Sequence, residues 1–378
     1  MKLAMNITRE PLAGITATNL SLLNYLHGSD TEVIGIELNA YRSFLSAVAY
    51  RHLSPDWFTH HVISTCDYSL MRIVKRAKTL KDVEDSFSEI IITIRGILRR
   101  ERPDIVLLNG TYFMPWLISI AARYEKIPVV LWYAGILSKE TEDMGLHFRN
   151  IFALMERSIV RNATRIIFPS QICKDAVYSL VAKSTKVQRG IVISNPISPI
   201  FTRSAVEYPV DRRIACIGRY TKIKNINGFF KLHKKLLTQG WKHQATLVSN
   251  IPKKDLKNIP KTIRIIPSMH ADELKTFYAS QGLVVSPSIF ETFGNVPIEA
   301  ACIGIPVLVN ETIGCSEILK NAGLERMVAS FDNIDEICER VKELCGAHIL
   351  PRQVSNLRKS VDTQYIANTI VTTIRQSF

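Results

Sequence analysis

The residues best suited to chemistry lie in one block, Leu283–Val309, which reads LVVSPSIFETFGNVPIEAACIGIPVLV. An apolar strand is predicted to end near Ser286, and the loop after it carries Glu291 and then Phe-Gly-Asn at 293–295. A helix is predicted to begin near Val296, and the proline in the next position is compatible with a first helical turn. One loop therefore brings a carboxylate and the amino end of a helix to the same place.

This arrangement suits a ligand that is both polyhydroxylated and anionic. The Glu291 carboxylate can accept hydrogen bonds from sugar hydroxyls, and the free N–H groups at a helix start can donate to phosphate or sugar oxygens. Gly294 permits close approach of the backbone to a ligand, and Glu299 in the first helical turn can reach a second pair of hydroxyls. An acid at that position is also explained by the helix dipole alone, an effect of about 0.3–1 kcal/mol. Two glutamates flanking Phe-Gly-Asn favour the binding interpretation.

A second feature is a basic pair, Arg219 and Lys224, between a predicted strand at Ile214–Ile217 and a predicted helix at Ile226–Leu237. The pair therefore follows the carboxyl end of a strand, where phosphate ligands bind in parallel α/β sheets. Arginine offers a planar fork that matches phosphate oxygens, whereas lysine offers a mobile point charge. Two unrelated surface cations remain the alternative.

The elements that must position these groups alternate along the whole chain, which predicts two successive doubly wound α/β domains with a ligand cleft between them. The proline-containing segment Asn195–Pro209 is the predicted interdomain linker. We therefore expect domains over residues 1–195 and 196–360, with a last helix in 361–378 that packs back on the first domain. Further predicted strands are 104–108, 128–132, 165–168, 191–193, 245–248, 263–265, 283–286 and 306–309. Further predicted helices are 16–26, 87–98, 115–124, 148–160, 171–181, 272–279, 296–303 and 364–375.

Composition narrows the class of protein. The 378 residues are 47% hydrophobic, which excludes a disordered or fibrous chain, and no apolar run is long enough to span a membrane. The amino end lacks the apolar stretch of a secretion signal, so we expect a cytosolic protein. The seven cysteines form no CxxC pair, which favours buried thiols over disulfides or a zinc site. They are Cys66, Cys173, Cys216, Cys302, Cys315, Cys338 and Cys345.

The net charge of +14 leaves nucleic acid, an acidic membrane surface and a phosphorylated substrate open. Two basic clusters, at Arg72–Lys81 and Arg95–Arg102, are interpreted first as solvated helix faces. Five cations near an anionic bilayer would nevertheless suffice for peripheral binding, at about 1 kcal/mol each.

These motifs together resemble a known family. The Glu-x-Phe-Gly…Glu block is similar to the motif of retaining nucleotide-sugar glycosyltransferases of the GT-B fold, in the large family four. Other segments agree with that family in the same order: Pro103–Val106, Met155–Arg157 through Pro169–Ser170, Val192–Pro196, Cys216–Asn225 and Arg264–Ser286. Pro11–Thr16 is a weaker match to the family's first glycine loop.

The resemblance implies a role for each matched residue. Arg219 and Lys224 would hold the donor diphosphate and stabilise it as it leaves, and Glu291 would hold hydroxyls of the transferred sugar. Donor-binding residues would be Gly14, Gly218, Met269, Phe293, Gly294, Asn295 and Glu299, with Glu299 on the ribose. No Asp-x-Asp pair was found in a suitable loop, so we expect a metal-independent reaction with no cofactor beyond the nucleoside-diphosphate sugar.

One segment departs from the family. The family commonly carries a histidine near the sugar after the predicted 128–132 strand, whereas this chain reads Trp-Tyr-Ala-Gly at 132–135. Tyr133 or His147 would then occupy the sugar or acceptor side. The implied reaction is front-face transfer of a hexose, with retention, to a hydroxyl of a cell-surface glycan, a lipid-linked intermediate or a small molecule.

Three other functions stay open. A nicotinamide-dependent oxidoreductase needs a G-x-G-x-x-G fingerprint, and Pro11–Thr16 offers a single glycine. A nucleic-acid binder would fit the charge, but no recognised motif accompanies it. A catalytically weak, glycosyltransferase-like partner subunit would fit the missing histidine.

Overall fold

The computed structural model describes residues 1–8, 14–39, 57–65, 70–181 and 185–376. Cys66 and the first half of the Pro11–Thr16 segment, residues 11–13, lie outside these residues. The chain divides into two compact units. Unit 1 contains residues 1–169, 173–193 and 364–378, and unit 2 contains residues 170–172 and 194–363.

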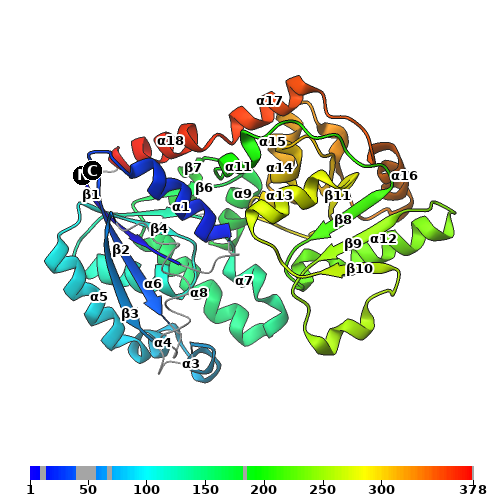
Figure 1. The fold of residues 1–378 in the computed structure, drawn as a ribbon. Helices are drawn as coiled ribbons and strands as arrows, with labels where there is room; N and C mark the ends of the chain where they lie inside the picture. The colour runs from blue at the N-terminus through cyan, green and yellow to red at the C-terminus, as the bar shows by residue number, and fades with distance from the viewer. Residues whose placement is uncertain (9–13, 40–56, 66–69, 182–184, 377–378) are drawn as a thin grey trace. The chain divides into compact units, whose positions relative to one another are not determined.

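Unit 1 is built on a parallel sheet that has, among the described residues, seven strands in the order β3-β2-β1-β4-β5-β6-β7 (Figure 1). The central strand β4 is buried along its whole length, as expected for a sheet covered on both faces. The strands are β1 (Lys2–Asn6), β2 (Glu32–Asn39), β3 (Thr59–Ser64), β4 (Ile105–Asn109), β5 (Val129–Trp132), β6 (Arg165–Phe168) and β7 (Ile191–Val192).

The helices of unit 1 differ in burial, since α6 is buried on nearly all sides whereas α5 buries one apolar face. Helix α5 buries Ile90, Ile94 and Ile97 at helical spacing, and it ends where Arg102 takes a left-handed conformation. Figure 1 shows the last helix, α18, beside α1, and Tyr25 of α1 donates a hydrogen bond to Asn368 of α18. The helices are α1 (Gly14–Leu26), α3 (Leu70–Arg76), α4 (Leu80–Ser86), α5 (Ser88–Glu101), α6 (Phe113–Tyr124), α7 (Leu137–Glu140), α8 (Leu146–Asn162), α9 (Gln171–Leu180), α10 (Thr185–Gln188) and α18 (Thr363–Arg375).

Unit 2 has its own parallel sheet, with six strands among the described residues in the order β10-β9-β8-β11-β12-β13. The strands are β8 (Arg213–Ile217), β9 (Gln244–Val248), β10 (Ile263–Ile266), β11 (Leu283–Ser286), β12 (Val307–Asn310) and β13 (Val328–Ala329). The α-helices are α11 (Pro199–Thr202), α12 (Ile226–Thr238), α13 (Ala271–Ala279), α14 (Asn295–Cys302), α15 (Cys315–Asn321), α16 (Ile334–Leu344) and α17 (Pro351–Ser360).

The predicted fold class, two Rossmann-like α/β domains, is confirmed. The predicted strands agree with the structure to within about a residue, but β1, β2, β3 and β13 were not predicted. The segment Asn195–Pro209 is more than a linker, because it contains α11 and buries Ile197 and Phe201 in the core of unit 2.

Candidate active site

The candidate site lies on unit 2, at the carboxyl ends of β8 and β11. These two strands are neighbours, with Leu283 opposite Ile214 and Val284 opposite Ala215. Because parallel strands end at the same edge of a sheet, the loop after β8 and the loop after β11 emerge together. The first loop carries Lys224, and the second carries Glu291.

Lys224 and Glu291 form an ion pair. The Lys224 Nζ lies 2.7 Å from Glu291 Oε2, and the two side chains are only 19% and 16% exposed. The other carboxylate oxygen, Oε1, accepts a hydrogen bond of 2.6 Å from Ser288 Oγ. The stem of Lys224 runs past Gly218, since a Cβ built at that glycine would lie 3.5 Å from Lys224 Cδ. Two predicted catalytic residues and one predicted donor-binding glycine therefore lie together.

Further hydrogen bonds tie the two loops to each other. The Ile289 N–H donates to Ile223 O at 2.8 Å, and the Asn225 amide donates to Pro287 O at 3.0 Å. Asn310, at the end of β12, donates to Ser288 O at 3.1 Å. Sequence analysis assigned no role to Asn225, Ser288 or Asn310, although serine and asparagine in strand-end loops are frequent hydrogen-bonding groups.

Gly294 is the residue before α14, with φ +98°, a conformation that side chains rarely adopt. A Cβ there would also lie 2.7 Å from Ile313 Cγ2, so the position is closed to other residues. Phe293 is 2% exposed, and its carbonyl accepts a hydrogen bond from Cys315 N. The turn before α14 is therefore held rigidly, and the first N–H groups of that helix have no partner within the helix.

Glu299 projects from α14 and accepts a hydrogen bond of 3.0 Å from the hydroxyl of Tyr278 in α13. Removal from water raises the pKa of Glu299 to about 7, although the Tyr278 hydrogen bond acts in the opposite direction. Tyr278 is fully buried and was not singled out in the sequence. Glu299 is thus poised to change charge near neutral pH.

The remaining predicted residues of unit 2 are Arg219, Asn295 and Met269. Arg219 follows Gly218 directly and is exposed. Asn295, the first residue of α14, accepts a hydrogen bond of 3.2 Å from Asn195. Met269 is half-buried in the turn between β10 and α13. The donor contacts of Arg219, Met269 and Asn295 stay predictions.

The predicted residues of unit 1 occupy different environments. Gly14 is the first residue of α1, and the loop before it lies outside the described residues. Tyr133 is fully buried and stacks on Phe168 at 5.3 Å, so its ring presents no surface to a ligand in this structure. His147 Nε2 lies 2.9 Å from Val74 O, which joins the start of α8 to α3. The predicted sugar contacts of Tyr133 and His147 remain untested.

A buried carboxylate holds the segment after Tyr133. Glu156 of α8 is inaccessible, and it accepts hydrogen bonds from Leu137 N at 2.6 Å and from Ser138 Oγ at 2.7 Å. Burial raises the pKa of Glu156 to about 7, against the effect of these hydrogen bonds. Glu156, the central residue of the Met155–Arg157 motif, therefore holds the amino end of α7.

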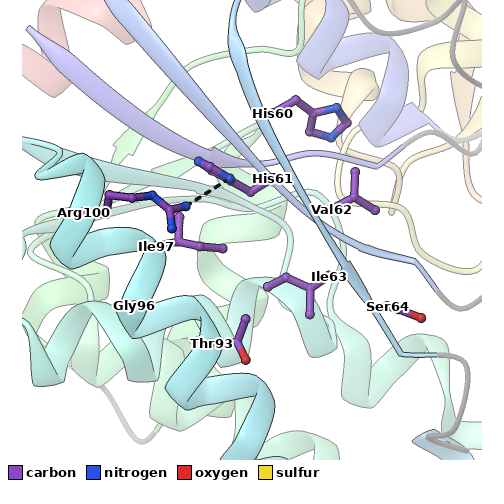
Figure 2. Close-up of a pocket in the computed structure, with 9 residues that line it drawn as sticks. All are labelled: His60, His61, Val62, Ile63, Ser64, Thr93, Gly96, Ile97 and Arg100. Carbon is purple, nitrogen blue, oxygen red and sulfur yellow. Dashed lines mark hydrogen bonds between the residues drawn. The ribbon is translucent and has the colours of Figure 1, made fainter.

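The Arg95–Arg102 cluster is not simply a solvated face. Arg95 Nε and Arg99 Nε lie 2.6 Å and 2.7 Å from the two carboxylate oxygens of Glu125. Arg100 borders a groove of about 560 Å³ between α5 and β3, and Figure 2 shows its guanidinium reaching His61. The charges of Arg95 and Arg99 are therefore partly neutralised by the single carboxylate of Glu125.

Within the described residues, no helix is long and apolar enough to cross a membrane, and no three His, Cys, Asp or Glu side chains gather as metal ligands do. Neither observation bears on the reaction.

Known proteins are similar to this chain in sequence and in fold. Residues 201–357 match the family model "Glycosyl transferases group 1". The chain is 24% identical over 306 residues to the capsular polysaccharide biosynthesis glycosyltransferase CapM of Staphylococcus aureus, which covers 75% of this chain and 79% of CapM.

Two solved structures resemble the whole chain. Sucrose-phosphate synthase from Thermosynechococcus elongatus has a TM-score of 0.70 at 14% identity, over 100% of this chain and 98% of that one. TarM of S. aureus, solved in complex with UDP among other ligands, has a TM-score of 0.71 at 10% identity, over 98% and 99% of the two chains. Residues 201–357 of unit 2 therefore match a glycosyl transferases group 1 domain, and the whole chain has the fold of GT-B glycosyltransferases.

Proposed function

We propose that this glycosyltransferase moves a hexose from a nucleoside-diphosphate sugar to a hydroxyl acceptor, with retention of the anomeric configuration and without a metal ion. The observation that supports it most directly is the Lys224–Glu291 pair at the carboxyl ends of β8 and β11. A cation that can neutralise a phosphate and a carboxylate that can accept from sugar hydroxyls stand side by side there.

Each group has a definite task in this proposal. Lys224 and Arg219 stabilise the negative charge that develops on the diphosphate as it leaves, an electrostatic effect often worth several kcal/mol. Glu291 orients the transferred sugar, and Glu299 accepts from the ribose hydroxyls. The leaving phosphate accepts the proton of the attacking hydroxyl, so the enzyme needs no nucleophile of its own. No cofactor other than the donor substrate takes part.

A relative, rather than the site, supports the proposed acceptor class. CapM is named for capsular polysaccharide biosynthesis, so we propose a glycan or lipid-linked acceptor for this chain as well. UDP is bound in TarM, which makes UDP-sugars the first donors to test.

The test is a donor panel in the presence of EDTA. Purified protein is incubated with UDP-, GDP- and ADP-sugars and with simple hydroxyl acceptors, and release of the nucleoside diphosphate is followed by coupled assay. We expect turnover with one donor, and a product whose anomeric proton coupling matches that of the donor. Turnover that requires a divalent metal, or a product of inverted configuration, would contradict the proposed mechanism. A catalytically weak partner subunit would release no nucleotide from any donor.

A further inference from the structure

We propose that Asn225 is a positioning residue of this site. Its side chain joins the loop that carries Lys224 to the loop that carries Glu291, and so holds the two charged groups against each other. The inference deepens the proposed function and rests on it where turnover is concerned.

The backbone of Asn225 is the first part of the argument. Its φ and ψ are 49° and 42°, in the left-handed region, directly between the short 3-10 helix η3 (Lys222–Lys224) and α12. Residues other than glycine, asparagine and aspartate adopt this backbone conformation at a cost in free energy. This single residue separates η3 from α12 immediately after Lys224. Glycine would serve this turn equally well, so the turn alone does not explain an amide side chain.

The amide makes two hydrogen bonds in two directions. Its Oδ1 accepts from Gly228 N at 3.2 Å, which caps α12, and its Nδ2 donates to Pro287 O at 3.0 Å. The orientation of the amide is fixed by its partners, because a backbone N–H only donates and a carbonyl only accepts. The fit is close, since a Cβ built at Gly228 would lie 2.6 Å from Asn225 Nδ2. One planar group thus connects the start of α12 to the end of β11.

A second asparagine provides a natural comparison. Asn310 donates to Ser288 O, so the consecutive carbonyls of Pro287 and Ser288 each accept from an asparagine amide. Asn310 lies at the end of β12, and its side chain donates to the loop that carries Glu291. The Asn225 side chain therefore joins the loop of Lys224 to the loop of Glu291, whereas the Asn310 side chain is bonded to the loop of Glu291 from β12.

Two substitutions separate the bridge from the turn. Asn225→Asp tolerates the left-handed backbone and keeps an acceptor for Gly228 N, but it loses the donor to Pro287 O and places oxygen against oxygen. Asn225→Gly keeps the turn and loses the whole side chain. Asn310→Ala is the matched control, because it removes an asparagine hydrogen bond to the carbonyl of Ser288, next to Pro287.

The first measurement is hydrogen exchange of the ligand-free protein, read at Ile289, whose N–H is bonded to Ile223 O between the loops. We expect exchange at Ile289 to rise about three- to tenfold in both Asn225 variants, the factor for one lost hydrogen bond. Exchange over residues 222–224 should rise with it. In Asn310→Ala, faster exchange should be confined to residues 286–291. Unchanged exchange in both Asn225 variants would overturn the bridge.

The second measurement is turnover of the donor found by the panel. Misplacement of Lys224 and Glu291 should lower kcat about tenfold in Asn225→Asp while KM for the donor and the melting temperature stay near those of the wild type. An unchanged kcat in both Asn225 variants of an active enzyme would overturn the positioning role. If wild type turns over no donor while exchange at Ile289 rises as expected, the proposed function fails and the bridge is supported. If Asn225→Asp does not fold, Asn225→Gly decides both measurements.

Discussion

The Lys224 ammonium and the Glu291 carboxylate lie 2.7 Å apart, and they meet only because β8 and β11 are neighbouring strands. Each group is the nearest opposite charge that the structure gives to the other. A donor diphosphate that binds to Lys224 must therefore compete with Glu291, and a sugar that binds to Glu291 must compete with Lys224. The pair is a preformed, mutually neutralised site.

The first prediction concerns that pair. Lys224→Ala and Glu291→Ala should each lower turnover about 100-fold, the usual cost of removing one electrostatic group from a site. Both side chains are largely buried but retain some contact with water, so each change should cost about 2 kcal/mol of stability, between the costs for exposed and fully buried pairs. Arg219→Ala should likewise lower turnover more than stability. Turnover assays and urea unfolding measure the two effects.

The controls are exposed residues of the same charge in unit 2, Lys231→Ala and Glu325→Gln, which should leave turnover unchanged. Variants of Arg219, Lys224 or Glu291 that unfold at normal temperature would instead mark these residues as structural.

The second prediction concerns pH and Glu299. Its pKa of about 7 means that the carboxyl is largely protonated at pH 6 and ionised at pH 8. An ionised carboxylate accepts from ribose hydroxyls more strongly, so affinity for the donor should rise across this interval. Calorimetry with an intact nucleotide-sugar is the suitable measurement, since the terminal phosphate of a free nucleotide titrates in the same range. Glu299→Gln should bind with an affinity independent of pH, and an unchanged slope in this variant would assign the effect to another group.

The third prediction concerns acid stability and is independent of catalysis. His233 is 2% exposed, and burial together with His243 lowers its pKa to about 4. Its Nδ1 lies 2.8 Å from His243 Nε2, and its Nε2 lies 2.8 Å from the hydroxyl of Thr262. Since His243 Nδ1 lies 2.9 Å from the carbonyl of Trp241, both rings fit the neutral Nδ1–H form in one chain of hydrogen bonds.

A lowered pKa means that the unfolded chain binds the proton more readily. The neutral His233 therefore makes its full contribution to the free energy of unfolding above pH 6.5, the pKa of this histidine in the unfolded chain. This contribution falls by about 3 kcal/mol as the pH falls toward 4. Urea unfolding at four pH values between 7.5 and 4.5 should show this fall. His233→Gln removes the titrating group and should flatten the curve; an equal slope in that variant would place the effect on other groups.

The fourth prediction concerns an anionic membrane surface. Arg72, Lys75 and Arg76 are exposed on α3, and Leu146, 69% exposed, precedes the His147 that is bonded to Val74 of the same helix. We expect the protein to co-sediment with vesicles that contain anionic lipid, and the charge reversal Lys75→Glu, Arg76→Glu and Lys78→Glu to reduce this binding. The same reversal at Lys253, Lys254 and Lys257 of unit 2 is the matched control. Equal binding by all three proteins would exclude a role for this face.

Most of the fold could be predicted from the sequence, since buried strands such as β4 and β5 are continuous apolar runs flanked by helical periodicity. The strands that were missed lack this signal. β3 reads THHVIS, with two histidines, and lies at the edge of the sheet, where one face and one edge are less buried. β13 has two residues and is defined by its pairing with β12 rather than by its own composition.

The residue types of the candidate site and the loops that carry them could be predicted from the sequence alone. Glu291, Glu299, Gly294 and the basic pair could be recognised because chemistry and backbone geometry restrict which residues serve there. Which of these residues contact one another depends on the tertiary structure. The fold brings Lys224 into an ion pair with Glu291, and it forms the hydrogen bonds from Asn225 to Pro287 and from Tyr278 to Glu299. It also buries Tyr133 in unit 1. Such pairings depend on contacts between segments far apart in the chain, which local periodicity does not encode.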